Sequence, residues 1–145
     1  LKKENIKATF FVLGTMVKSN PDILKRENDE GHYIANHGYS HVYKKVYKNA
    51  NAPLEEYKKA NKLIQDALGE PNYQSNVFRF PGGSVGGYYD KIKAKAKKAM
   101  RNFWVSQIKI YSILRLLVNI SHSLLSLFFI FSWQIGHSNT RFSVE

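Results

Sequence analysis

The sequence contains no cysteine, so it can form neither disulfide bonds nor thiolate metal sites. Acidic residues are also scarce, with 11 Asp and Glu against 22 Lys and Arg, which gives a formal net charge of +11. This charge raises the question of nucleic-acid binding, yet no RNA-recognition, helix-turn-helix or zinc-finger signature is present. Many lysines lie among acids, as in Glu55–Lys59, which is typical of a solvated helix face. We therefore expect no nucleic-acid partner.

The chain has 145 residues, of which 43% are hydrophobic, and this is enough for a globular domain with a core. Up to Phe103 the pattern alternates between short apolar runs, typical of buried strands, and segments with helical periodicity. Strands are expected at Ala8–Leu13, His32–Asn36 and Val77–Phe80, and helices between Pro21 and Gly31, at Pro53–Leu68 and at Tyr88–Phe103. Strands that alternate with helices through short links predict an α/β fold, either a parallel sheet or a barrel.

The composition changes after Phe103, and we divide the chain into a domain at 1–103 and an apolar tail at 104–145. Residues 108–135 contain no acid, glycine or proline and are rich in Ile, Leu, Phe and Ser. Three explanations remain open for this helical tail. Residues 116–135 have the length of a membrane anchor, the segment could be a buried helix, or AT-rich coding DNA has been translated in a shifted frame.

The hexapeptide Asn36–His41 (NHGYSH) carries the strongest chemical signal. Two histidines four residues apart can bind one divalent metal through neutral imidazole nitrogens, although chance or packing explains many such pairs. Zinc is the default metal for this ligand type, and cobalt, nickel or iron also suit histidine with a carboxylate. His37 and His41 follow an expected strand, where α/β proteins build their sites. His32 should point to the opposite face and have a structural role.

A second candidate site segment, Arg79–Ser84 (RFPGGS), also follows an expected strand. A buried strand seldom ends in arginine unless the charge is paired or faces a cleft. The glycines after Pro81 allow backbone N–H groups to approach a ligand closely and to help a metal stabilise an oxyanion. The alternative is an ordinary turn that follows a salt-bridged arginine.

Together, Ala8–Gly14 (ATFFVLG), Gly31–His41 (GHYIANHGYSH) and Phe78–Ser84 (FRFPGGS) resemble three successive landmarks of the NodB-homology polysaccharide deacetylases, carbohydrate esterase family 4. The resemblance covers residues 1–103. It implies a partial, distorted (β/α) barrel. It also implies hydrolysis of N-acetyl groups from an N-acetylglucosamine polysaccharide such as peptidoglycan or chitin, by a parent enzyme that is extracellular or at the cell surface.

The resemblance also implies roles for individual residues. The family's H-[ST]-x-x-H motif falls on His37 and His41, which would be ligands of a divalent metal, most simply zinc. Its arginine motif falls on Arg79, which would orient a catalytic carboxylate, and Gly82 would offer its backbone N–H to the oxyanion. In such a mechanism a metal-activated water attacks the amide carbonyl, a carboxylate takes its proton, and a histidine protonates the leaving amine.

The sequence departs from the family pattern in several places. Gly38 stands where the family has Ser or Thr, and the T-F-D-D-G motif, which supplies the base and the third metal ligand, is absent. It should precede Ala8, where only seven residues remain. His122 and His137 do not fit the family's L-x-H motif, so we assign them no catalytic role. We therefore expect an N-terminally truncated, inactive fragment with an unrelated or frameshifted tail. The alternative is a membrane-anchored, basic cell-envelope protein that binds wall polymer without catalysis, with 116–135 inserted in the membrane.

Overall fold

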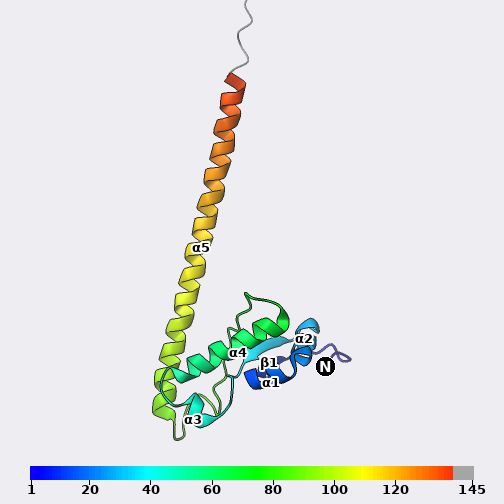
Figure 1. Cartoon of the computed structure of the whole chain (residues 1–145), viewed down its shortest axis with the longest axis vertical. Helices are drawn as coiled ribbons and strands as arrows, with labels where there is room; N and C mark the ends of the chain where they lie inside the picture. Colours follow the sequence, from blue (N-terminus) through cyan, green and yellow to red (C-terminus); the bar gives the residue numbers. More distant parts are fainter. Residues whose placement is uncertain (139–145) are drawn as a thin grey trace, which may run out of the picture. The chain divides into compact units, whose positions relative to one another are not determined.

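The computed structural model describes residues 1–138, with side chains described for residues 1–118 except those of Tyr111 and Leu116. The chain divides into two compact units, Leu1–Arg101 and Asn102–Glu145. The first contains two strands, four helices and the start of α5 (Asp90–Ser138), and the described part of the second continues α5 (Figure 1). The division into domains at 1–103 and 104–145 stays a prediction.

The two strands of the first unit form a parallel pair. β1 (Thr9–Val12) lies beside β2 (Tyr33–Asn36), with Thr9 opposite Tyr33 and Val12 opposite Asn36. Parallel strands need a crossover connection, which α1 (Gly14–Ser19) and α2 (Pro21–Asp29) provide. Val17, Leu24, Ile34 and Ile64, all 3% exposed or less, form the core cluster. This arrangement is the α/β fold that the alternating pattern predicted.

Helix α4 (Ala52–Leu68) packs against the crossover helices and matches the predicted helix within one residue. Its buried face includes Tyr57, Ala60 and Ile64, and it ends at Gly69, whose φ of +68° is the left-handed conformation that glycine adopts easily. At the contact with α1, a Cβ added to Gly14 would lie 3.1 Å from the Ala60 Cα. A glycine at position 14 therefore permits this close helix packing.

Three local predictions were wrong. α1 and α3 (Tyr43–Val46) are not expected from the sequence, because helices of six residues or fewer show no clear apolar periodicity. Val77–Phe80 forms no strand of its own among the described residues and makes one parallel bridge, between Asn36 and Phe78. It meets β2 only at that strand's last residue, and Pro81 has no N–H with which to extend a ladder. α5 begins at Asp90 rather than at Tyr88.

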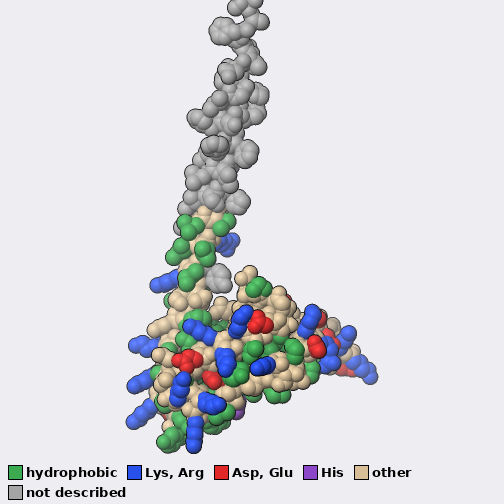
Figure 2. Space-filling model, viewed as in Figure 1, with side chains coloured by type: hydrophobic (Ala, Val, Ile, Leu, Met, Phe, Trp, Pro, Cys, Tyr) green, Lys and Arg blue, Asp and Glu red, His purple; other side chains and the backbone are tan. Residues whose placement is uncertain are grey.

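The surface of the first unit carries dispersed positive charge. Figure 2 shows Lys and Arg side chains spread over the visible face among acidic and hydrophobic ones. Within the residues that the structure describes, no helix combines the length and apolarity needed to cross a membrane. Most of 116–135 lies outside the residues with described side chains, so membrane association through that segment stays a prediction.

Candidate metal centre and active site

The two candidate ligands lie in a short loop, residues 37–41, which we call the histidine loop. It begins directly after β2, and the His37 N–H donates to the Val12 carbonyl at 2.9 Å. The N–H groups of Gly14 and Thr15, at the start of α1, donate to the carbonyls of Gly38 and Tyr39 at 2.9 and 3.0 Å. The loop is therefore held by the end of β1 and the first turn of α1, so its position is determined by the βαβ unit.

Asn36 holds the histidine loop from within the core. Its side chain is fully buried, with 0% exposure. The side-chain amide donates to the Tyr57 carbonyl at 3.0 Å, and its Oδ1 accepts the Gly38 N–H at 2.8 Å. Both halves of the amide are therefore satisfied, which is what a buried polar group requires. Asn36 ties the end of β2 to α4 and to the loop.

Glu56, on α4, holds the loop from the other side. Its Oε2 accepts the N–H groups of Tyr39 and Ser40 at 3.0 and 2.7 Å, and the Ser40 hydroxyl donates to the same carboxylate. The sequence predicts a solvated face for Glu55–Lys59, and for Glu56 this prediction is wrong. Nothing in the local sequence separates it from its neighbour Glu55, which forms an exposed ion pair with Lys48.

The imidazole rings of His37 and His41 converge, with ring centroids 5.0 Å apart. His37 Nδ1 lies 2.8 Å from the Arg79 carbonyl. That oxygen can only accept, so Nδ1 carries the proton and the Nε2 lone pair is available to a metal. Burial lowers the pKa of His37, the hydrogen bond to the Arg79 carbonyl opposes this, and the charges of His41 and Arg79 lower the pKa further. A lowered pKa favours the neutral imidazole, which is the form that binds metal.

His41 differs from His37 in exposure and in backbone conformation. It is exposed to solvent, and its φ of +56° is in the left-handed region, which few residues other than glycine occupy. Such conformations persist where the surroundings fix them and are concentrated at functional sites. The contacts that fix the histidine loop thus hold His41 in a conformation that brings its ring beside His37.

The described residues contain no third metal ligand in this site. Within residues 1–118, no three His, Asp or Glu side chains are grouped so as to hold a metal ion. Two neutral imidazoles fit a borderline metal such as zinc in ligand type, but three protein ligands are usual in a catalytic zinc site. The donor set of the described chain is therefore suitable but incomplete. His122 and His137 lie outside the residues with described side chains.

Arg79 reaches the histidine site through its backbone rather than through its charge. Its carbonyl accepts from His37, while its exposed guanidinium carbon lies 3.8 Å from the centroid of the Phe11 ring. Within the described part of the chain, no carboxylate lies within 4.0 Å of the guanidinium. The salt-bridged turn that we considered as an alternative is therefore not what the structure contains. The predicted carboxylate partner of Arg79 is equally missing among these residues.

Gly82 joins the site through Tyr43. Its φ is +69°, and a Cβ added there would lie 2.7 Å from the Tyr43 hydroxyl oxygen. The Tyr43 ring in turn lies 5.6 Å from the ring of His41. Among the described residues the Gly82 N–H donates no hydrogen bond, so it is available to a ligand. His37, His41, Arg79 and Gly82 thus belong to one contiguous site.

Comparison with known proteins identifies the family. The profile of the family described as "Polysaccharide deacetylase" matches residues 1–103, most of the chain. The chain belongs to the polysaccharide deacetylase family. A peptidoglycan-N-acetylglucosamine deacetylase of Bacillus cereus is 36% identical over 104 residues, which are 72% of this chain and 37% of that protein. Chitin deacetylase 1 of Cryptococcus neoformans is 36% identical over 96 residues, 66% of this chain and 19% of that protein.

The solved structures give the same family. The polysaccharide deacetylase Bc1974 of Bacillus cereus matches with a TM-score of 0.54 and 35% identity, covering 67% of this chain and 46% of Bc1974. This family member therefore spans less than half the length of the relatives it matches. The family match covers residues 1–103, and the three sequence landmarks lie within the same range. The family resemblance is confirmed, whereas the roles of the site residues stay predictions.

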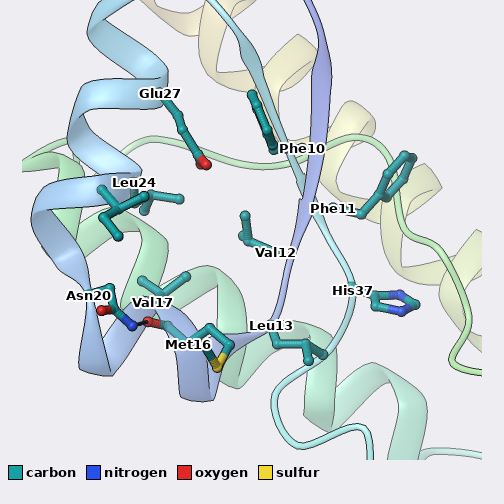
Figure 3. Close-up of a pocket in the computed structure, with 11 residues that line it drawn as sticks. Phe10, Phe11, Val12, Leu13, Met16, Val17, Asn20, Leu24, Glu27 and His37 are labelled. Atoms are coloured by element: carbon teal, nitrogen blue, oxygen red, sulfur yellow. Dashed lines mark hydrogen bonds between the residues drawn. The ribbon is translucent and has the colours of Figure 1, made fainter.

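In this deacetylase family member a groove of about 490 Å³ lies beside the histidine site. Figure 3 shows Leu24 and Glu27 of α2 on one side of β1, and Phe11 and His37 on the other. The sheet has only two strands, so one edge of β1 has no strand partner in the described chain. His32 is 7% exposed and its Nδ1 accepts the Ala8 N–H, in agreement with the structural role predicted for it.

Glu27, in this groove, gives a pH-dependent prediction. Partial burial raises the pKa of Glu27, while His32 and Arg26 counteract the rise. A carboxyl whose pKa is higher in the folded chain destabilises the fold once it is ionised, so stability falls as pH rises through this window. Glu27→Gln should therefore stabilise the fold at pH 7 and raise its melting temperature. The gain in the free energy of unfolding should be less than about 1 kcal/mol, because the group is partly solvated.

Thermal unfolding at pH 7 and near pH 4 measures this effect. The stabilisation by Glu27→Gln should be much smaller at the lower pH, where most of the wild-type carboxyl is protonated in both states. Glu70→Gln, at an exposed position, is the matched control and should change little at either pH. A stabilisation by Glu27→Gln of the same size at both pH values would contradict the assignment.

Proposed function

We propose that this chain is part of a metal-dependent hydrolase that removes N-acetyl groups from an N-acetylglucosamine polysaccharide of the peptidoglycan or chitin type. One observation carries the proposal: two imidazoles converge at the end of β2, and the Nδ1 of one is fixed by the Arg79 carbonyl. The names of the relatives, which deacetylate peptidoglycan or chitin, support the same substrate class. In this proposal the βαβ unit is one part of a distorted (β/α) barrel, and the complete enzyme acts outside the cell or at its surface.

Each site residue has a distinct task in this proposal. His37 and His41 hold a divalent metal, most simply zinc, with the Arg79 carbonyl fixing the tautomer of His37. When bound, such a metal polarises the amide carbonyl and lowers the pKa of water. The Gly82 N–H donates to the oxyanion that develops on the carbonyl oxygen. The guanidinium of Arg79 positions the carboxylate that takes the proton from water.

The described chain lacks that carboxylate and the third ligand, and no histidine is assigned to protonate the leaving amine, so we propose that it does not turn over substrate by itself. Both missing groups are carboxylates of the T-F-D-D-G motif that the family resemblance implies. Among the residues that the structure describes, one edge of β1 has no strand partner, so a further parallel strand could pair there. Such a strand would end beside His37, because the carboxyl ends of parallel strands lie at the same edge of a sheet.

Acetate release from zinc-supplemented protein with tetra-N-acetylchitotetraose tests the proposed function. We expect no zinc-dependent turnover from the chain of 145 residues. A chain extended before Leu1 by a strand that ends in Thr-Phe-Asp-Asp-Gly should release acetate slowly, with the leaving amine taking its proton from water because no histidine is assigned to supply it. The same extension with both aspartates changed to asparagine should release none. Circular dichroism establishes that both extended chains fold alike. Turnover by the unextended chain, or equal turnover by the two extensions, would contradict the proposed roles.

A further inference from the structure

A cluster of tyrosines continues the site beyond His41. We call Tyr43, Tyr47, Tyr88 and Tyr89 the tyrosine cluster. The Tyr43 ring lies 5.6 Å from His41, 6.1 Å from Tyr47 and 6.4 Å from Tyr89, measured between ring centroids. Tyr47 and Tyr89 stack at 5.1 Å, and Tyr88 meets Tyr89 edge-on at 5.0 Å. The four rings therefore form one connected aromatic cluster that begins at a candidate metal ligand.

The cluster is anchored at one end. Tyr47 is 2% exposed, and its hydroxyl donates to the Pro81 carbonyl, immediately before Gly82. Burial raises the pKa of Tyr47 to about 12, with a contribution from Tyr43, so the hydroxyl stays a donor at neutral pH. Lys93, 4% exposed, donates to the Gly82 carbonyl at 3.3 Å and lies 5.4 Å from the Tyr47 ring centroid. The Gly82 turn and the cluster are thus fixed to each other.

The other end of the cluster is open to solvent. Tyr43 is 43% exposed and Tyr88 is 95% exposed. The almost fully exposed ring of Tyr88 adds little to core packing. Its edge-on contact with Tyr89 nevertheless orients it. Tyrosine offers a large, rigid and amphipathic contact area at a low cost in conformational entropy. Exposed aromatic surface that adjoins a candidate active site is suited to binding a ligand with apolar and hydroxyl-rich faces.

The Tyr43 side chain lies directly against the Gly82 backbone. A side chain at position 82 would begin 2.7 Å from the Tyr43 hydroxyl oxygen and 3.0 Å from the ring carbon that bears it. Tyr43 therefore fills the room that a larger residue after Pro81 would need. It lies between His41 and the backbone N–H that we assign to the oxyanion. A sugar ring stacked on Tyr43 would have its substituents next to both groups.

We propose that Tyr43 and Tyr88 form a carbohydrate-binding subsite on which pyranose rings of a β-linked N-acetylhexosamine polymer stack. The apolar C–H face of a pyranose packs on the aromatic ring, and its hydroxyl groups remain solvated at the rim. A ring bound on Tyr43 places its acetamido group beside His41 and Gly82, and the next ring along the polymer reaches Tyr88. The inference rests on the proposed function and adds the residues that would select a polymer over a free sugar.

Titration of the metal-free chain with tetra-N-acetylchitotetraose, followed by calorimetry or NMR, tests the subsite. Tyr43→Leu and Tyr88→Leu keep apolar side chains but remove the rings, and each should weaken binding about five- to tenfold. Tyr43→Phe should bind within about twofold of wild type, because the stacking face is kept. Tyr33→Leu is the matched control: Tyr33 is 39% exposed at the opposite end of β2, and its loss should leave the affinity unchanged.

Three results would overturn the subsite. They are no binding by the folded wild type at millimolar oligosaccharide, unchanged affinity in both leucine variants of the subsite, and an equal loss in Tyr33→Leu. Zinc titration of the same samples separates this inference from the proposed function. Absence of zinc binding with a Tyr43-dependent oligosaccharide affinity would refute the metal centre alone. Zinc binding at His37 and His41 without any effect of the tyrosines would refute the subsite alone.

Discussion

Asn36→Ala is expected to lower the free energy of unfolding by about 2–4 kcal/mol, because a fully buried amide with two hydrogen bonds is removed. The buried Gly38 N–H would lose its partner, at a cost of about 1–3 kcal/mol, and the Tyr57 carbonyl, which lies within α4, would lose its side-chain donor. The small cavity left behind adds to this cost. Urea unfolding followed by circular dichroism measures the change.

Asn76→Ala provides the control for this substitution, because the same change is made at an exposed position. Its free energy of unfolding should stay within about 0.5 kcal/mol of wild type. If Asn36→Ala proved as mild as Asn76→Ala, Asn36 would not be the residue that joins β2, α4 and the histidine loop. The loop geometry described above would then need another support.

His37→Ala and His41→Ala should each weaken zinc binding by at least about tenfold. Loss of a residue that only supports a ligand already costs about 10–100-fold in affinity, and loss of a ligand itself costs at least as much. With only two imidazoles in the described site, either substitution leaves a single protein donor. Calorimetric titration of protein without an affinity tag measures both affinities.

His122→Ala is the matched control, because we assign that histidine no role in the site. Its zinc affinity should equal that of the wild type. The double variant His37→Ala with His41→Ala should retain only the weak zinc binding of the remaining protein surface. Zinc binding that falls in His122→Ala and persists in the double variant would place the metal elsewhere in the chain.

Much of the fold could be predicted from periodicity and punctuation. The run Ala8–Leu13 contains β1, and Pro53–Leu68 coincides with α4, because a short apolar run rich in β-forming residues and an amphipathic helix each leave a clear pattern. The short helices α1 and α3 left no such pattern. Each has six residues or fewer and is held by tertiary contacts, as where Gly14 packs against Ala60.

The site was predictable only where residue type and spacing carry the chemistry. His37 and His41 could be paired because histidine is a metal ligand and a four-residue spacing after a strand allows convergence. The supports of the pair could not be found in this way. Glu56 lies in a run of charged residues, and only the packing of α4 against the histidine loop brings its carboxylate to Tyr39 and Ser40. The position of Tyr43 beside His41 and Gly82 could not be predicted either, because it also depends on tertiary packing.

Zinc titration of the wild-type chain, followed by long-range ¹H–¹⁵N NMR of the imidazole rings, tests the central claim most directly. We predict that zinc shifts the Nε2 resonance of His37 while its Nδ1 keeps the proton donated to the Arg79 carbonyl. One ring nitrogen of His41 should shift in parallel, and the buried ring of His32 should not respond. Zinc that left His37 and His41 unchanged, or that shifted only His32, His122 or His137, would contradict the assignment.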